Sequence, residues 1–293
     1  MRLATFVREG AARVGAVVGE EIVDLARASG DAASPPTMLE LLARGAAGLD
    51  AAQRAVDAAL KQRPAGAVLP LAGVTLQAPI PRPGKIIGVG LNYKDHAAEV
   101  GRPKQDAPRL FVKVASSVTG PGTSVAIPPG IKKLDFEVEL AVVIGKRSRQ
   151  VTEADAVAHI AGYTILNDLS AREFQFDVAP PQTSLAKSMD GFCPMGPWIV
   201  TADELGDGSG LGVRTWVNGE KMQDGSTADL IFTVPALMAY ISRYMTLEPG
   251  DVIATGTPAG VGAFRKPPLF LKGGDRIKME IERIGALETT ITP

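Results

Sequence analysis

Residues 135–140 read Asp-Phe-Glu-Val-Glu-Leu, and this stretch carries the most informative pattern in the chain. Side chains alternate between the two faces of a strand, so Asp135, Glu137 and Glu139 are predicted to share one face. The run continues as Ala-Val-Val-Ile-Gly, which indicates a buried strand. Neighbouring buried carboxylates repel one another, and a divalent cation relieves that repulsion. The alternative is the solvated face of an edge strand.

The composition limits what else the protein can be. Its 293 residues include 31 Lys+Arg and 32 Asp+Glu, for a net charge of −1, which disfavours a general electrostatic grip on nucleic acid or an anionic membrane. Cys193 is the only cysteine, so an intramolecular disulfide and a Cys-rich zinc site are excluded. His96 and His159 are the only histidines. Any bound metal is therefore expected to have oxygen ligands.

Targeting and membrane signals are not evident in the sequence. The first ten residues reach Arg8 and Glu9 before an apolar stretch long enough for a signal peptide can form. No run approaches the roughly 20 apolar residues that a membrane span needs. We expect a cytoplasmic protein with no membrane partner.

Two domains are predicted. Residues 1–80 contain three short apolar or alternating strands with Gly10 and Gly19 at turns, then helices over 37–43 and 49–61, then a strand-like stretch over 71–80. Three prolines follow closely in the segment Pro-Ile-Pro-Arg-Pro-Gly-Lys. We place the boundary there, with a small β-rich domain at 1–80 and a larger one at 81–293.

The second domain is dominated by strands. Eight candidate strands lie between residues 85 and 285, and only three helices are expected, over 152–159, 170–176 and 234–244. Strands and helices do not alternate, which disfavours a doubly wound nucleotide-binding fold. The predicted class is α+β and β-rich.

Further polar residues follow predicted strands. Asp168 ends an apolar strand and stands one helical turn before Arg172, although a capping aspartate with a surface ion pair explains the pair equally well. Lys187 lies in a loop bounded by Gly and Pro, where a solvated lysine is the simpler interpretation. His96 and Glu99 have the i, i+3 spacing by which a carboxylate can orient a general base.

A glycine-rich turn follows a later strand, at residues 255–262, with the sequence Thr-Gly-Thr-Pro-Ala-Gly-Val-Gly. Its backbone N–H groups could bind a carboxylate or a phosphate, although most such loops only turn the chain.

These pieces occur in a fixed order, and that order resembles the fumarylacetoacetate hydrolase superfamily from about Lys85 to the C-terminus. The motifs are NYxxHxxE, DxExEL, NDxSAR, a Lys-Ser loop and TGTPxGVG, at residues 92–99, 135–140, 167–172, 187–188 and 255–262. The longer fumarylacetoacetate hydrolase proper has a further aspartate ligand shortly before its histidine. Here Gly-Val-Gly-Leu-Asn-Tyr-Lys-Asp-His has no acid at that place, so the chain is similar to the shorter bacterial-type members.

The resemblance implies a mixed β-sheet roll, a homodimer and a divalent cation, Mg²⁺ or Mn²⁺ with Ca²⁺ as a further option. It places the metal on Glu137, Glu139 and Asp168, and oxygen ligands suit these cations. It implies catalytic roles for His96, Glu99 and Lys187. The residues that it implies for binding a small anionic 2-oxo acid are Arg172, Gln175, Lys113 and Thr257.

The function expected from this set is hydrolysis of the C3–C4 bond of a 2,4-dioxo acid, acylpyruvate-type or sugar-derived, through an enolate. His96 would activate water, while the metal and Lys187 would stabilise the enolate. The alternative uses the same enolate without water: decarboxylation of oxaloacetate, or keto–enol tautomerisation or isomerisation. A binding protein without activity is a third class, and the complete set of acids, His-Glu pair and lysine argues against it.

Overall fold

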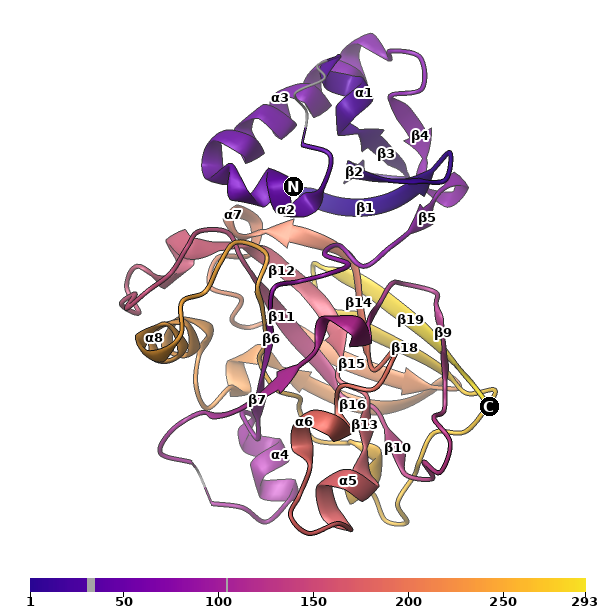
Figure 1. Cartoon of the computed structure of the whole chain (residues 1–293), viewed down its shortest axis with the longest axis vertical. Coiled ribbons are helices and arrows are strands. Elements are labelled where there is room, and N and C mark those ends of the chain that lie inside the picture. Colours follow the sequence, from indigo (N-terminus) through magenta and orange to yellow (C-terminus); the bar gives the residue numbers. More distant parts are fainter. Residues whose placement is uncertain (31–34, 104) are drawn as a thin grey trace.

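The computed structural model describes residues 1–30, 35–103 and 105–293 and confirms the predicted α+β, β-rich class. Its largest sheet has twelve strands, ten of them in the order β4-β3-β2-β1-β14-β12-β11-β17-β6-β7, with β5 beside β1 and β8 beside β14. A second sheet has the order β16-β15-β18-β19-β9. The first elements of the chain lie at one end of the molecule, and helices α4 and α5 lie at the other (Figure 1).

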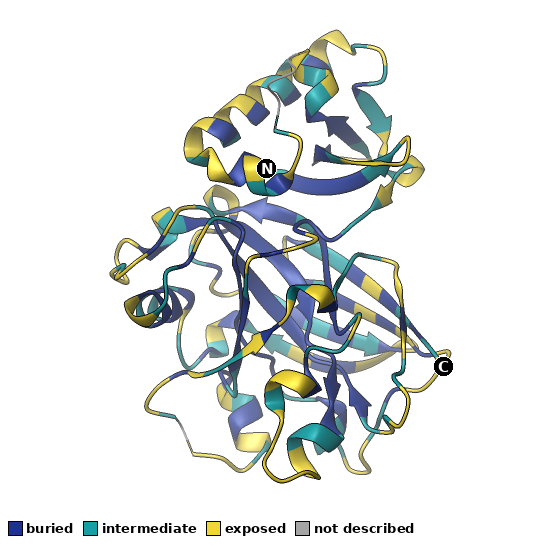
Figure 2. Cartoon of the chain, in the orientation of Figure 1, coloured by how far each residue is buried: buried dark blue, intermediate teal, exposed yellow. Residues whose placement is uncertain are grey.

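The N-terminal strands form by the expected hairpins. β1, β2 and β3 are joined at Gly10 and Gly19, whose φ angles of 75° and 60° suit glycine. Helix α3 buries one side through Gly48, Ala52, Val56 and Ala59, and its opposite side is exposed (Figure 2). The bounds here are β1 Arg2–Arg8, β2 Ala11–Val18, β3 Glu21–Asp24, α1 Leu25–Ser29, α2 Met38–Ala43, α3 Gly45–Gln62, β4 Val68–Pro70 and β5 Thr75–Leu76.

The strand-like stretch predicted over 71–80 is mostly not a strand. Leu71–Gly73 form a 3₁₀ turn, and only two residues of the stretch, in β5, pair with β1. The first eighty residues also share a sheet with the rest of the chain, because Arg2 and Leu3 of β1 pair with Val200 and Ile199 of β14. The division at residue 80 stays a prediction.

The site is built around β11, whose seven residues Val138–Ile144 are all buried. It lies between β12 and β17, antiparallel to both, and β17 runs parallel to β6. The long strands around it are buried along most of their length (Figure 2). The bounds are β6 Ile86–Gly90, β7 Arg109–Lys113, β8 Val118–Thr119, β12 Ile160–Asn167, β14 Cys193–Thr201 and β17 Val252–Ala254.

One continuous strand over 135–145 was expected, and the structure shows a break. β10 (Leu134–Asp135) pairs with β13 (Ser170–Ala171), and β11 begins only at Val138. Asp135 accepts the N–H of Phe136 at 2.8 Å, which bends the backbone where the chain changes partner. Asp135 is therefore held outside the strand that carries Glu139.

The second sheet packs against the first and closes the larger core, which takes Val142 and Ile165 from one sheet and Met279 and Leu287 from the other. Helix α8 (Val234–Tyr244) forms as predicted. The other two predicted helices are wrong in extent, since only Ala156–His159 is helical (3₁₀) in the first and the second is β13 followed by α5 (Arg172–Phe176). The remaining bounds are β9 Ser124–Ala126, β15 Gly212–Val217, β16 Glu220–Ser226, β18 Arg276–Ile281, β19 Gly285–Thr292, α4 Lys94–Glu99, α6 Thr183–Ala186 and α7 Ala202–Leu205.

Within the described residues, no helix combines the length and the apolar character that crossing a bilayer requires.

Candidate active site

Three buried carboxylates meet where β11 begins and β12 ends. Glu137 and Glu139 flank Val138, which pairs with Asn167, the last residue of β12. Asp168 is the next residue after Asn167. One oxygen of each carboxylate can be chosen so that all three lie within 4.8 Å of one another. The structure therefore brings together the three residues that the sequence proposed as metal ligands.

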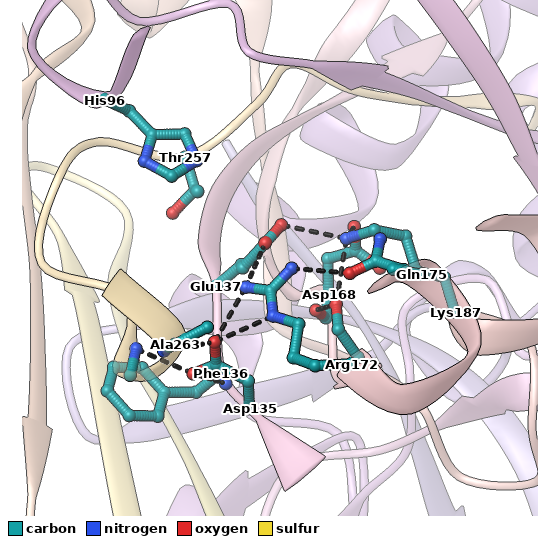
Figure 3. Close-up of polar contacts among 12 residues, drawn as sticks. His96, Asp135, Phe136, Glu137, Asp168, Arg172, Gln175, Lys187, Thr257 and Ala263 are labelled. Atoms are coloured by element: carbon teal, nitrogen blue, oxygen red, sulfur yellow. Dashed lines mark hydrogen bonds and ion pairs between the residues drawn. The ribbon is translucent and has the colours of Figure 1, made fainter. Parts of the chain in front are cut away.

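Two lysines hold these acids. The Nζ of Lys187, at the C-terminal end of α6, donates to Glu137 at 2.9 Å, to Ser170 Oγ at 2.9 Å and to Asp168 (Figure 3). Lys113 donates to Asp168 Oδ1 at 2.7 Å and to the carbonyls of Lys187 and Phe192. An ammonium has three N–H donors, and protein acceptors occupy all three of Lys113's. Lys113 therefore supports Asp168 from behind, and its contact with substrate stays a prediction.

Arg172 joins two acids and the polar Gln175. Its Nε donates to Asp135 at 2.8 Å, one terminal nitrogen donates to Glu137 at 2.7 Å, and the other donates to Gln175 Oε1 at 2.7 Å (Figure 3). Burial alone would lower the pKa of Arg172, but Asp135 and Glu137 outweigh it and raise that pKa above its usual range. Arg172 is charged, and it fixes Glu137 from the side opposite Lys187.

The two glutamates have opposite electrostatic environments. Burial would raise the pKa of Glu137, but Lys187 and Arg172 overcome it and bring that pKa to about 2. Burial raises the pKa of Glu139 well above its usual value, and the negative charges of Asp168 and Glu137 add to the effect. Among the described residues Glu139 forms no ion pair, and its one hydrogen bond comes from the N–H of Gly256 at 2.8 Å. A further cation beside Glu139 would therefore stabilise the ionised form of this carboxylate.

His96 and Glu99 form the predicted pair on α4. The Nδ1 of His96 lies 2.8 Å from Glu99 Oε2, and Glu99 Oε1 accepts the N–H of Gly260 at 2.9 Å. The Phe264 ring packs edge-on against the imidazole, with centroids 5.8 Å apart. Because a carboxylate beside Nδ1 favours the proton there, Nε2 is the nitrogen that can accept a proton.

The glycine-rich loop binds anions, but they belong to the chain itself. Its N–H groups at Gly256, Gly260 and Gly262 donate to Glu139, Glu99 and Asp135. The φ of Gly260 is 103°, and a Cβ there would run into the carbonyl of Met222. The loop therefore orients acids of the site in place of cradling a ligand phosphate.

One cavity of about 120 Å³ unites most of these groups. Among the predicted site residues it is lined by His96, Glu137, Glu139, Arg172, Gln175, Lys187 and Thr257, and Asp168 lies behind Lys187. The cavity is also lined by three residues that were not expected from the sequence, Arg102, Arg109 and Phe111. Arg109, Phe111 and Lys113 occupy every second position of β7 and so share one face. This period-two spacing could have identified Arg109 and Phe111.

Gln223 was missed for a different reason. It is buried on β16 and donates to Thr257 Oγ1 at 2.7 Å, so it contacts the site from behind. No motif or spacing in the sequence indicated it.

The chain matches a known protein family. Residues 85–292 match the family model described as "Fumarylacetoacetate (FAA) hydrolase C-terminal". The chain is 46% identical over 257 residues to the Homo sapiens protein "Oxaloacetate tautomerase FAHD2A, mitochondrial", which covers 88% of this chain and 80% of the relative.

Two solved structures resemble the whole chain. A fumarylacetoacetate hydrolase from psychrophilic Exiguobacterium antarcticum has a TM-score of 0.85 and 37% identity, covering 100% of this chain and 99% of the other. A maleylpyruvate hydrolase from Sphingobium sp. SYK-6, in complex with manganese(II) and pyruvate, has a TM-score of 0.80 and 35% identity with the same coverage. Both likenesses extend over the residues of the candidate site.

Proposed function

Because the chain belongs to the fumarylacetoacetate hydrolase family, we propose that it is a metal-dependent enzyme that forms the enolate of a small 2-oxo acid. Its first proposed reaction is keto–enol tautomerisation of an acid of the oxaloacetate type. The observation that carries the proposal is the position of His96, oriented by Glu99, on the cavity that also exposes Glu137 and Glu139. The relative named as an oxaloacetate tautomerase supports the choice of reaction.

The donor set fits a hard divalent cation. Glu137, Glu139 and Asp168 would hold Mg²⁺ or Mn²⁺, with Ca²⁺ as the alternative, because all three offer carboxylate oxygens. Among the described residues no cation forms an ion pair with Glu139, and such an ion would lie beside this carboxylate. A cation bound there supplies charge stabilisation for the 2-oxo oxygen as the enolate develops.

The chain's own residues supply positioning and proton transfer. Nε2 of His96 would take the proton from C3 of the keto form, and protonation of the 2-oxo oxygen would complete the enol; the reverse reaction would return a proton from His96 to C3. Glu99 would keep the imidazole in the right tautomer. Lys187, Arg172, Gln175 and Thr257 would hold the carboxylate and the enolate oxygen.

Hydrolysis of a 2,4-dioxo acid is the second candidate. There His96 would activate a water for attack on the 4-oxo carbon, and cleavage of the C3–C4 bond would leave the same enolate. The maleylpyruvate hydrolase with its bound manganese and pyruvate supports this reading. Decarboxylation of oxaloacetate would also pass through that enolate and would be recognised by release of CO₂.

We further propose a homodimer. Edge strand β7 exposes Val112, Val114 just after the strand is also exposed, and so is Leu185 of the contacting helix α6. Exposed apolar side chains on an edge strand favour burial against another chain. Light scattering on a size-exclusion column would give the mass, and Val112→Lys should shift it to that of one chain.

The test of function asks which of three products the Mg²⁺-loaded protein forms. Oxaloacetate and an acylpyruvate are followed by NMR in D₂O: deuterium at C3 indicates enolisation, pyruvate plus a second acid indicates hydrolysis, and CO₂ indicates decarboxylation. His96→Ala should abolish the reaction, whereas His159→Ala should not, since His159 pairs with Ser148 away from the cavity. Metal binding with no chemistry on any substrate would identify a binding protein and overturn the proposal.

A further inference from the structure

Two arginines lie in the outer part of the cavity. Arg102 and Arg109 line it and are exposed to solvent. Glu137 and Glu139 are the acids of its lining, and no carboxylate lies within ion-pair distance of either arginine in the part of the chain that the structure describes. The outer region therefore carries positive charge that the described residues do not balance.

Strand β7 carries Arg109 on the same face as Lys113, which contacts Asp168. The strand places every second residue on one face: Lys113, Phe111 and Arg109. The centre of the Phe111 ring lies 5.0 Å from Lys187 Nζ. Residues two apart on a strand are separated by about 7 Å, so the Arg109 backbone stands about 13 Å from that of Lys113. Arg102 follows α4, and its N–H donates to the carbonyl of Ala97 at 3.0 Å. The two arginines therefore approach from separate elements, β7 and the end of α4.

The inner cations already balance carboxylates of the cluster, whereas the outer arginines have none within ion-pair distance among the described residues. Arg172 is paired with Asp135 and Glu137, and Lys187 with Glu137 and Asp168. We propose that Arg102 and Arg109 form a second anion subsite for the distal carboxylate of the substrate, so that the enzyme prefers 2-oxo diacids to 2-oxo monoacids. The proposal rests on the function above, with the 2-oxo end of the substrate at the acidic triad.

Oxaloacetate and 2-oxobutanoate are a matched pair for the test, because they differ only in a carboxylate against a methyl group at C4. In Arg102→Met and Arg109→Met, the KM for oxaloacetate should rise about tenfold, the loss of roughly one charge-assisted contact. The KM for deuterium exchange into 2-oxobutanoate should stay unchanged. Arg276→Met, an exposed arginine on β18, is the control. An equal change for both acids, or none for oxaloacetate, would overturn the subsite.

Calorimetry separates failure of the subsite from failure of the proposed function. If the Mg²⁺-loaded wild type transforms neither acid, the function fails, and the affinities of the two acids are compared directly. A preference for the diacid that Arg109→Met abolishes supports the subsite without turnover. Equal affinities of the wild type for both acids, or no binding of either, count against it.

Gln223 carries a second, independent inference. Its side-chain oxygen accepts the N–H of Val138 at 3.1 Å and the hydroxyl of Thr215 at 3.0 Å, and its nitrogen donates to the Pro258 carbonyl at 2.8 Å. A backbone N–H can only donate and a backbone carbonyl can only accept, so the orientation of the amide is fixed. The same nitrogen donates to Thr257 Oγ1.

The hydroxyl proton of Thr257 is thereby left for another acceptor. Thr257 lines the cavity, and among the described residues its hydroxyl donates to none. We infer that Gln223 is a positioning residue that makes Thr257 a hydrogen-bond donor to the substrate carboxylate. Because Gln223 also holds Val138, between Glu137 and Glu139, it ties the acidic cluster to the glycine-rich loop.

The test is Gln223→Glu, whose carboxylate still accepts from Val138 but can also attract the hydroxyl of Thr257. The KM for the 2-oxo acid should rise several-fold at high pH, with kcat nearly unchanged. Protonation of the new carboxyl restores a donor, so the KM should recover as pH falls.

Thr257→Val should raise KM by a similar factor, and the double variant should add nothing further. A pH-independent rise, or additive effects, would leave Gln223 with only a structural role. Were the wild type inactive, the affinity for 2-oxobutanoate would replace KM as the readout.

Discussion

Nδ1 of His96 lies 2.8 Å from Oε2 of Glu99, and the second oxygen of that carboxylate is held by the N–H of Gly260. The i, i+3 spacing on one helical turn brings the pair together, and the glycine-rich loop fixes the acid from its other side. The imidazole is thereby tied to a loop about 160 residues later in the chain. Its free nitrogen is oriented before any substrate arrives.

Glu99→Gln should lower kcat about 10- to 100-fold with a smaller change in KM. A glutamine has one acceptor oxygen for two N–H donors, so either the imidazole or Gly260 faces an NH₂ group. A general base typically raises the reaction rate 10²–10⁴-fold, and a misoriented base loses part of that rate enhancement. Steady-state kinetics check it, with the exposed Glu153→Gln as control. A normal kcat with an unchanged melting temperature would remove Glu99 from the mechanism.

Two substitutions in the acidic cluster should have opposite effects on the metal-free protein. Glu139 is buried without a cationic partner, so Glu139→Gln should leave the melting temperature equal or higher. Glu137→Gln removes a partner from both Lys187 and Arg172, so it should lower stability, by about 3 kcal/mol or more.

Thermal unfolding with and without Mn²⁺ completes this comparison. Mn²⁺ should raise the melting temperature of the wild type, because it binds the folded state, and should do so much less in both variants. Equal stabilisation of wild type and Glu139→Gln would mean that the cation binds elsewhere.

Strand periodicity is local, so it could place Glu137 and Glu139 on one face, but it grouped Asp135 with them. The family resemblance is what selected Glu137, Glu139 and Asp168 as the metal ligands. Asp168 ends an apolar run, but its position beside the two glutamates depends on long-range strand order. The contacts of Lys113 could not be predicted, because its direction is set by two carbonyls and a carboxylate that the sequence does not bring together. Gln223 and Arg102 carry no periodic signal.

The same contrast holds for the fold. Hairpins closed at Gly10 and Gly19 follow from local turn chemistry, and α8 follows from its amphipathic period. The break between β10 and β11 could not be foreseen, since it depends on Asp135 meeting Arg172 and the N–H groups of Gly262 and Ala263. The helix predicted over 152–159 reduces to a 3₁₀ turn at 156–159, as tertiary context overrides propensity there.

Cys193 should not react with thiol reagents in the folded protein at pH 8. Burial raises the pKa of its thiol to about 12; Lys113 opposes this effect, and the negative charges of Asp168 and Glu139 add to it. At pH 8 only about one thiol in 10⁴ would then be ionised, and the side chain is fully buried. Labelling with iodoacetamide, followed by mass spectrometry, should appear only when denaturant is added. Rapid labelling of the native protein would contradict the packing around β14.

A fragment of residues 81–293 should fail to fold as a soluble protein. Removing residues 1–80 strips β1 from β14 and leaves the backbone groups beside Ile199 and Val200 unpaired at the edge of the large sheet. Ile199 also belongs to a core cluster with Leu3, Val14 and Val56, so its apolar surface would become exposed. Expression of the fragment beside the full chain, followed by size-exclusion chromatography and circular dichroism, measures this. A monodisperse fragment with a cooperative melt would show that the catalytic part folds alone, and the predicted boundary at residue 80 would then be a division between independent domains.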